Sequence, residues 1–294
     1  MILEHKPFTK ILVDGGDPEE TKRIEALLGF KVDGQTTNPS LIAKNPEIMA
    51  LVKSGHRLSK AEEDAEYKKI VQSVSPLVGE AGVSIEVFAD ADTTAEQMIA
   101  EAREKYTWIP NAYIKLPTTK AGLEAGEKLT AEGVRLNFTL CFTQEQAAAV
   151  YAATKGAKSP AYVSPFIGRL DDIGQNGMDL IRNIKQMFAA GDGHVEVLSA
   201  SVRSMDHLMA IFEYKSDLAT VPTPILEKWE AAGFPMPDES YIYPAGALQP
   251  ITYKEISLDQ SWNSYDIHSD LTDQGIAKFV ADYKATLMGS GTEV

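Results

Sequence analysis

The sequence predicts an α/β fold, and within that class a (β/α)8 TIM barrel, from three observations. Short apolar runs alternate with amphipathic helical runs along the chain, a pattern typical of a parallel sheet. Eight such strand–helix units follow one another with short links, which fits a closed barrel in a chain of 294 residues. A doubly wound open sheet is the alternative, but no glycine-rich phosphate loop of the GxGxxG or GxxxxGK[ST] kind follows a strand.

The expected strands are the apolar runs at residues 11–16, 32–40, 83–90, 113–117, 134–142, 161–166, 194–201 and 218–221. Capping residues predict where helices begin: Asp17-Pro18, Ser59 with Glu62, Thr93-Thr94, and Thr143 with Gln146. Glycines predict where several of them end: Gly29, Gly133, Gly156 and Gly233. Later helices are expected from about residue 119 to 133, 143 to 156, 178 to 190 and 223 to 233, with one more through His207 and Phe212.

The alternation breaks after Gly233. Residues 234–262 are rich in proline and tyrosine and predict an extended segment that crosses the surface. Residues 268–288 predict a final amphipathic helix, whose apolar stripe includes Ile276 and Phe279. We therefore expect a single barrel domain over residues 1–294, with 234–294 as an extension and a C-terminal helix that packs on the barrel.

Composition limits the class of protein. The net charge of −14 argues against binding to nucleic acid or to an anionic membrane, both of which favour basic proteins. One cysteine, Cys141, excludes an intramolecular disulfide and fits a reducing compartment. No run approaches the roughly 18 apolar residues of a membrane span, and the N-terminus lacks a signal-peptide pattern. A soluble, cytoplasmic protein is expected.

Polar residues stand where buried parallel strands are normally apolar. Because strand side chains alternate between two faces, most of the expected strands have one aliphatic face and one that is polar toward the carboxyl end. In a barrel the polar face points inward, and active sites lie at the carboxyl ends of the strands. The residues expected to converge there are Asp14, Asn38, Glu86, Lys115, Asn137, Thr139, Ser164 and Ser201.

Lys115 is the most informative of these residues, because burying an ammonium without a partner is costly. A structural ion pair with Glu86 is one explanation. The other is Schiff-base chemistry, in which Lys115 attacks a carbonyl while Asp14 and Glu86 move protons. Carboxylates beside the lysine would hold it in its charged form. We therefore expect Glu86 and Thr139 to act on Lys115 through a water rather than by a direct ion pair.

Two arginines follow strands and could clamp a phosphate with Ser201. They are Arg169 and Arg203, and the alternative for either is a surface salt bridge to Asp171, Asp172 or Asp206. The five histidines are scattered and no cysteine pair exists, so no metal site is expected.

Four motifs in order resemble the transaldolase family. They are Asp33-Gly34-Gln35-Thr36-Thr37-Asn38-Pro39-Ser40, Ile114-Lys115-Leu116-Pro117, Leu136-Asn137-Phe138-Thr139-Leu140 and Ser164-Pro165-Phe166-Ile167-Gly168-Arg169. The resemblance runs from about Ile11 to Arg203. It implies a class I aldolase-type barrel in the pentose phosphate pathway that transfers a dihydroxyacetone unit between sugar phosphates, with no cofactor.

The resemblance also implies a role for each site residue. Lys115 matches the Schiff-base lysine and Asp14 the acid/base for carbon–carbon cleavage, while Glu86 and Thr139 match residues that hold the catalytic water. The substrate-binding residues implied are Asn38, Asn137, Ser164 and Phe166 for the sugar, and Arg169, Ser201 and Arg203 for the phosphate.

Two alternatives stay open, and the sequence leaves a homodimer as one possible assembly. Fructose-6-phosphate aldolases, which release dihydroxyacetone, tend to carry Gln at the position of Glu86 and Tyr at that of Phe166, and they are shorter. A catalytically silent barrel that binds a sugar phosphate is the second alternative.

Overall fold

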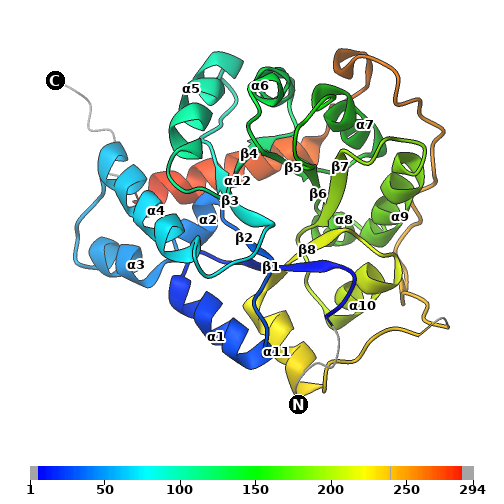
Figure 1. The fold of residues 1–294 in the computed structure, drawn as a ribbon, viewed down its shortest axis with the longest axis horizontal. Coiled ribbons are helices and arrows are strands. Elements are labelled where there is room, and N and C mark those ends of the chain that lie inside the picture. The colour runs from blue at the N-terminus through cyan, green and yellow to red at the C-terminus, as the bar shows by residue number, and fades with distance from the viewer. Residues whose placement is uncertain (1–5, 239, 287–294) are drawn as a thin grey trace.

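Eight parallel strands close into a barrel in sequential order, so the predicted fold class is confirmed (Figure 1). The structure is a computed structural model that describes residues 6–238 and 240–286. The strands are β1 (Lys10–Asp14), β2 (Gly34–Thr36), β3 (Gly82–Glu86), β4 (Ala112–Pro117), β5 (Leu136–Cys141), β6 (Ala161–Pro165), β7 (Val195–Ser199) and β8 (Leu218–Pro222).

The helices surround this barrel, and none in the described ranges has the length and hydropathy of a membrane span. They are α1 (Pro18–Leu28), α2 (Pro39–Ile42), α3 (Pro46–Lys53), α4 (Lys60–Val74), α5 (Ala95–Tyr106), α6 (Lys120–Ala131), α7 (Gln144–Ala153), α8 (Ile167–Asp172), α9 (Gly177–Phe188), α10 (Met205–Glu213), α11 (Thr223–Ala231) and α12 (Asp270–Thr286), with a 3-10 turn at Trp262–Ser264.

The predicted caps are confirmed. The side chains of Asp17, Ser59, Thr94 and Thr143 each accept a hydrogen bond from a backbone N–H in the first turn of a helix. Two short helices differ from the expectation. Helix α2 begins at Pro39, inside the run 32–40 that is expected as a strand, and α8 lies between the expected strand at 161–166 and the expected helix from 178, where the sequence predicts no element. The last two residues of the expected C-terminal helix, 287 and 288, lie outside the described residues.

The barrel interior is built in two layers. The lower layer is an apolar cluster to which strands around the barrel contribute Leu12, Tyr113, Tyr162, Leu198 and Leu218. Because side chains alternate, the residue two positions further along each strand points inward one layer higher. For four of the strands that higher residue is polar: Asp14, Lys115, Ser164 and Thr220.

The seventh strand reverses the expected orientation. The sequence suggests that Ser199 and Ser201 share the inward face, opposite Leu198. In the structure Leu198 lies in the interior cluster, and Ser199 Oγ is 2.8 Å from Ser216 Oγ, outside that cluster. The strand ends at Ser199, and Ser201 has a left-handed backbone with φ of 60°. That turn, and not strand alternation, directs Ser201 to the site.

The fifth strand is oriented by its packing against α6. Phe138 faces outward, and α6 approaches its ring through Gly126, where a Cβ atom would lie 2.2 Å from the ring. With Phe138 on the outer side, the neighbours Asn137 and Thr139 are turned toward the interior.

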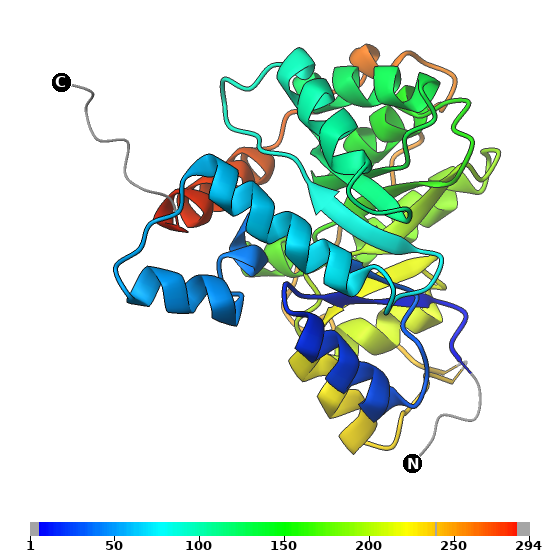
Figure 2. The ribbon, with the colours of Figure 1, turned by 60° about the vertical axis from the view of Figure 1, so that its left-hand side comes forward.

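The C-terminal segment runs along one side of the barrel before α12 crosses it (Figures 1 and 2). Asn183 on α9 donates to the carbonyl of Ile251 at 2.8 Å, and Trp262 donates to Glu127 on α6 at 3.2 Å. Helix α12 then contacts β5 and α2, with Ile276 and Phe279 in the same hydrophobic core as the barrel. Residues far apart in sequence are thus brought over the carboxyl ends of the strands.

Candidate active site

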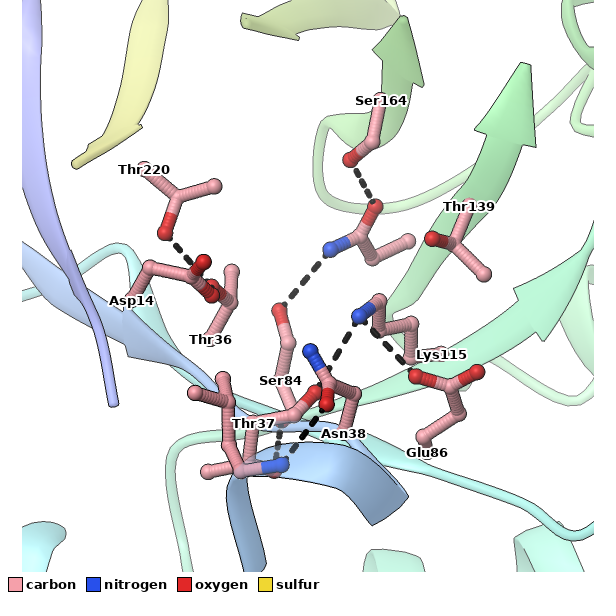
Figure 3. Close-up of polar contacts among 12 residues, drawn as sticks. Asp14, Thr36, Thr37, Asn38, Ser84, Glu86, Lys115, Thr139, Ser164 and Thr220 are labelled. Carbon is pink, nitrogen blue, oxygen red and sulfur yellow. Dashed lines mark hydrogen bonds and ion pairs between the residues drawn. The ribbon is translucent and has the colours of Figure 1, made fainter. Parts of the chain in front are cut away.

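Lys115 lies inside the barrel on β4 with its side chain almost fully buried (Figure 3). Its Nζ atom is 2.9 Å from Glu86 Oε2 and donates a hydrogen bond to the carbonyl of Thr37 at 3.1 Å. Glu86 is in register with Lys115 on the neighbouring parallel strand, so the two side chains share a face. The expectation that Glu86 acts without a direct ion pair is therefore wrong, because this register brings the two groups into contact.

Burial raises the pKa of Glu86, and the charge of Lys115 is the main influence that opposes the rise. Oε2 of Glu86 accepts no hydrogen bond of good geometry from the residues that the structure describes. The hydroxyl of Thr139 is equally buried and also has no hydrogen-bond partner in the described ranges. Figure 3 places Thr139 near Lys115 and Glu86. A carboxylate oxygen that pairs with Lys115 and a hydroxyl that has no hydrogen-bond partner in the described ranges therefore lie beside the lysine.

Asp14 ends β1 on the other side of the interior and is partly exposed to the cavity above it. Its Oδ1 atom accepts a hydrogen bond from Thr36 Oγ1 at 2.9 Å. Burial raises the pKa of Asp14, and the charge of Lys115 and the bond from Thr36 oppose this rise. Asp14 therefore takes up a proton more readily than an exposed aspartate does.

Beneath the surface of the site, hydrogen bonds link the side chains of Ser84, Asn137 and Ser164. Asn137 donates from Nδ2 to Ser84 Oγ at 3.0 Å, and its Oδ1 accepts from Ser164 Oγ at 2.7 Å. Asn38 is held differently, because it caps α2: its Oδ1 accepts from the backbone N–H of Leu41 at 2.9 Å. The amide nitrogen of Asn38 is the group left to face the cavity.

A cavity of about 660 Å³ opens above these residues. Eight predicted site residues line it: Asp14, Asn38, Lys115, Ser164, Phe166, Arg169, Ser201 and Arg203. The other three, Glu86, Asn137 and Thr139, are buried beneath the lining. The structure therefore brings the predicted residues together from the strands β1, β3, β4, β5 and β6 and from the segments that follow β2, β6 and β7.

One end of the cavity is cationic. Arg203 pairs with Asp172, as the salt-bridge alternative expects for one arginine. Within the described residues Arg169 has no carboxylate partner, and its guanidinium lies 5.4 Å from the centre of the Phe166 ring. Burial and the nearby charge of Arg203 lower the pKa of Arg169. The two adjacent guanidinium groups repel each other, and a bound anion would relieve this repulsion, so this end of the cavity is suited to binding an anion.

Gly168 allows this arrangement. A Cβ atom at this position would lie 2.3 Å from the carbonyl oxygen of Ser201 and 2.6 Å from Nε of Arg203. The missing side chain lets Arg203 lie across the start of α8.

Helix α12 supplies cavity residues that the sequence analysis misses. Leu271, Gln274, Lys278 and Phe279 all line the cavity. The Phe279 ring is 5.9 Å from Lys115 Nζ and 5.7 Å from the guanidinium of Arg169, so it lies between the two halves of the site. The amphipathic stripe predicts that Phe279 packs on the barrel, but not against which residues.

Gly275 is the sequence signal that could reveal this contact. A Cβ atom there would lie 2.6 Å from Nη1 of Arg169 and 2.6 Å from Cδ2 of Leu140. A glycine inside a helix is disfavoured unless something must approach closely. Thr272 anchors the same turn by donating to the carbonyl of Leu140 at 2.9 Å. Two further lining residues lie on strands and are not among the site residues predicted from the sequence: Thr36 and Thr220.

In the part of the chain that the structure describes, one group of side chains has the spacing of a metal site: His268, Asp270 and Asp273. All three are exposed at the start of α12, and none lines the cavity around Lys115.

Comparison with known proteins gives one family. The family model described as Transaldolase/Fructose-6-phosphate aldolase matches residues 11–289. A probable transaldolase of Methanococcus maripaludis is 34% identical over 94% of this chain and 98% of its own length. A probable transaldolase of Dehalococcoides mccartyi is 33% identical over 94% of this chain and 98% of its own length. A probable transaldolase 2 of Listeria monocytogenes is 37% identical over 74% of this chain and 87% of its own.

The Lys115–Glu86 pair predicts a stability effect that depends on pH. Lys115→Met keeps most of the side-chain volume but leaves the buried carboxylate of Glu86 without its cation. Breaking a buried pair from one side costs about 3–5 kcal/mol, so we expect the free energy of unfolding to fall by about that much near pH 8.

The loss should shrink near pH 5, because removing Lys115 raises the pKa of Glu86 further. A carboxyl whose folded pKa lies above its unfolded value loses stability as the pH rises between the two. Urea unfolding at both pH values measures the effect. The double variant Lys115→Met/Glu86→Gln is the control and should recover most of the loss near pH 8. An equal loss at both pH values in the single variant would contradict this account.

Proposed function

The chain belongs to the transaldolase/fructose-6-phosphate aldolase family, and from this premise and the geometry of the site we propose that it works as a transaldolase. It would move a dihydroxyacetone unit from a ketose phosphate, such as sedoheptulose 7-phosphate or fructose 6-phosphate, to an aldose phosphate. The acceptors are glyceraldehyde 3-phosphate and erythrose 4-phosphate. A cytoplasmic location and a homodimer stay predictions from the sequence.

The observation that carries the proposal is the position of Lys115 Nζ. It lines a cavity of about 660 Å³, is held by Glu86 and the Thr37 carbonyl, and has Thr139 beside it. A lysine that served only to fill a structural ion pair would need no access to a cavity. Here the amine can reach a carbonyl carbon that enters from above.

Glu86 is the group best placed to take the ammonium proton of Lys115, since it is 2.9 Å away and burial raises its pKa. The neutral amine then attacks C2 of the ketose phosphate and gives a carbinolamine. Loss of the C2 hydroxyl as water needs a proton, which Glu86 can return through a water held by Thr139. The product is an iminium ion on Lys115.

Asp14 is suited to the carbon–carbon step. It accepts the proton of the C4 hydroxyl, the C3–C4 bond breaks, and its electrons move into the iminium to give an enamine on Lys115. The aldose phosphate leaves. The enamine then attacks the aldehyde carbon of the acceptor, and Asp14 returns its proton to the new hydroxyl. One water hydrolyses the resulting iminium, which frees the product ketose phosphate and the amine of Lys115. No external oxidant or reductant enters this sequence.

The remaining residues fit substrate positioning. Arg169 and Arg203 with Ser201 would hold the phosphate at the cationic end. The sugar hydroxyls would meet Asn38 and Ser164 on the wall, with Asn137 supporting Ser164 from beneath.

Aldolase activity without transfer is the second candidate, since the family description names fructose-6-phosphate aldolase as well. Release of dihydroxyacetone requires protonation of the enamine carbon and then hydrolysis, whereas transfer requires neither before the acceptor binds. Phe166 lines the cavity and offers no hydroxyl, and position 86 is a carboxylate and not an amide. Both features favour transfer.

Borohydride trapping tests the Schiff base. Fructose 6-phosphate with borohydride should attach a dihydroxyacetone unit or the whole sugar irreversibly to Lys115, as mapped by peptide mass spectrometry. Lys115→Ala should give no adduct. Lys44→Met and Lys278→Met are matched controls, because each removes another lysine from the same cavity lining and should leave the adduct in place.

The same experiment with and without an acceptor aldehyde separates the candidates. A transaldolase passes the dihydroxyacetone unit from Lys115 to erythrose 4-phosphate before it is reduced and forms sedoheptulose 7-phosphate, so that this acceptor lowers the yield of the three-carbon adduct. Dihydroxyacetone released equally fast without an acceptor would favour the aldolase. Binding without any reducible adduct would favour a catalytically silent barrel.

The role of Asp14 predicts a separation of steps. Asp14→Asn should lower kcat by about 10²–10⁴, the usual contribution of a general base, while the Lys115 adduct with the intact ketose still forms. The wild-type kcat should fall toward acid in a range above that of an ordinary aspartate, because burial raises the pKa of Asp14 and the base must be deprotonated. Stopped-flow and steady-state rates against pH measure both effects. An Asp14→Asn variant that retains turnover would refute the assignment.

A further inference from the structure

Tyr67 on α4 is a buried residue outside the cavity lining. Its hydroxyl connects the end of β3 to the residue that follows β2. The hydroxyl accepts a hydrogen bond from the backbone N–H of Glu86 at 2.9 Å and contacts Thr37 Oγ1. Thr37 Oγ1 itself donates to the carbonyl of Ser84 at 2.7 Å.

These contacts fix the direction of each hydrogen bond. The single hydroxyl proton of Thr37 is used on Ser84, so the Tyr67 hydroxyl must donate its own proton to Thr37. Burial raises the pKa of Tyr67, which keeps this proton in place. The bonds therefore run in one line, from the Glu86 N–H through Tyr67 and Thr37 to Ser84.

Two residues of this line, Glu86 and Thr37, contact Lys115. The carbonyl of Thr37 accepts from Lys115 Nζ at 3.1 Å, and the carboxylate of Glu86 lies 2.9 Å from the same atom. One phenol hydroxyl is thus hydrogen-bonded to the backbone N–H of Glu86 and to the side chain of Thr37, the two residues that contact the amine in the described structure.

Lys105 on α5 completes the support. Its buried Nζ donates to the carbonyl of Glu86 at 3.0 Å and pairs with Glu101 at 2.7 Å. It also lies 4.9 Å from the centre of the Tyr67 ring and 5.3 Å from that of Trp108. The amide N–H and the carbonyl of Glu86 are therefore both bonded to side chains of the surrounding helices, and this end of β3 cannot shift without breaking one of them.

We propose that Tyr67 is a positioning residue for Schiff-base formation. It fixes the Thr37 carbonyl and the Glu86 carboxylate against Lys115 and does not contact the substrate. This inference rests on the proposed function. Reacting groups that are displaced by about 1 Å can lose about 10²-fold in rate, so a residue one step behind the amine can limit its chemistry.

The test is Tyr67→Phe, which removes the hydroxyl and keeps the ring with its edge contact to Trp108. We expect the first-order rate of Lys115 adduct formation, and kcat with it, to fall by about 10–100-fold. KM should stay within about twofold, because no residue of the cavity lining changes.

Tyr151→Phe is the matched control. The Tyr151 hydroxyl also makes two hydrogen bonds at 2.9 Å, one to the Asp192 carboxylate and one from the Asp192 N–H, in the loop that leads into the amino end of β7. Both variants should lose similar stability in urea unfolding, but Tyr151→Phe should keep the wild-type rates. Thr37→Val, which removes the acceptor for Tyr67, should behave like Tyr67→Phe, and Thr37→Ser should retain more of the rate than Thr37→Val.

Equal rates for Tyr67→Phe and Tyr151→Phe, or a rise in KM at constant kcat, would overturn the inference while leaving the proposed function intact. If Tyr67→Phe does not fold, the comparison of Thr37→Val with Thr37→Ser decides: equal rates in that pair would also overturn it. A wild-type chain that forms no reducible adduct would overturn the proposed function and this inference together.

Discussion

Lys115 and Glu86 face each other from neighbouring strands inside the barrel, 2.9 Å apart and both almost fully buried. Two charges in such a place are stable only together, and only if hydrogen bonds compensate for the lost water. The Thr37 carbonyl supplies one such bond directly. Tyr67 and Lys105 hold the peptide groups of Glu86 from outside the barrel. Much of the polar structure around β2 and β3 can be understood as support for this pair.

The cavity above the pair has two chemically different ends, and α12 joins them. The Phe279 ring lies within about 6 Å of both the ammonium of Lys115 and the guanidinium of Arg169. Gly275 lets the helix come close enough for this, since a side chain there would collide with Arg169 and Leu140. The Phe279 ring lies over the amine of Lys115. Arg169 and Arg203 make the other end of the cavity cationic and suited to binding an anion. The C-terminal helix is thus part of the site, although it is distant in sequence from every motif that identifies it.

Strand alternation predicts most of the interior correctly, because a residue two positions after an inward apolar side chain also faces inward. Lys115 follows Tyr113 in this way, and Asp14 follows Leu12. The rule fails at Ser199, where the polar residue bonds to Ser216 outside the interior cluster. It also fails at Ser201, which reaches the cavity through a left-handed turn. Register between strands is invisible in one sequence, which is why the direct contact of Glu86 with Lys115 is one alternative and cannot be chosen over contact through a water. The contacts of α12 depend on the path of a long irregular segment, which no local pattern determines.

A crystal structure of the chain reduced with borohydride in the presence of fructose 6-phosphate would test the central claim most directly. In the adduct that keeps the whole sugar, we expect a covalent bond from Lys115 Nζ to C2, the C4 hydroxyl within hydrogen-bonding distance of Asp14, and the phosphate between Arg169 and Arg203. An adduct on another lysine, or a phosphate beyond the reach of both arginines, would contradict it.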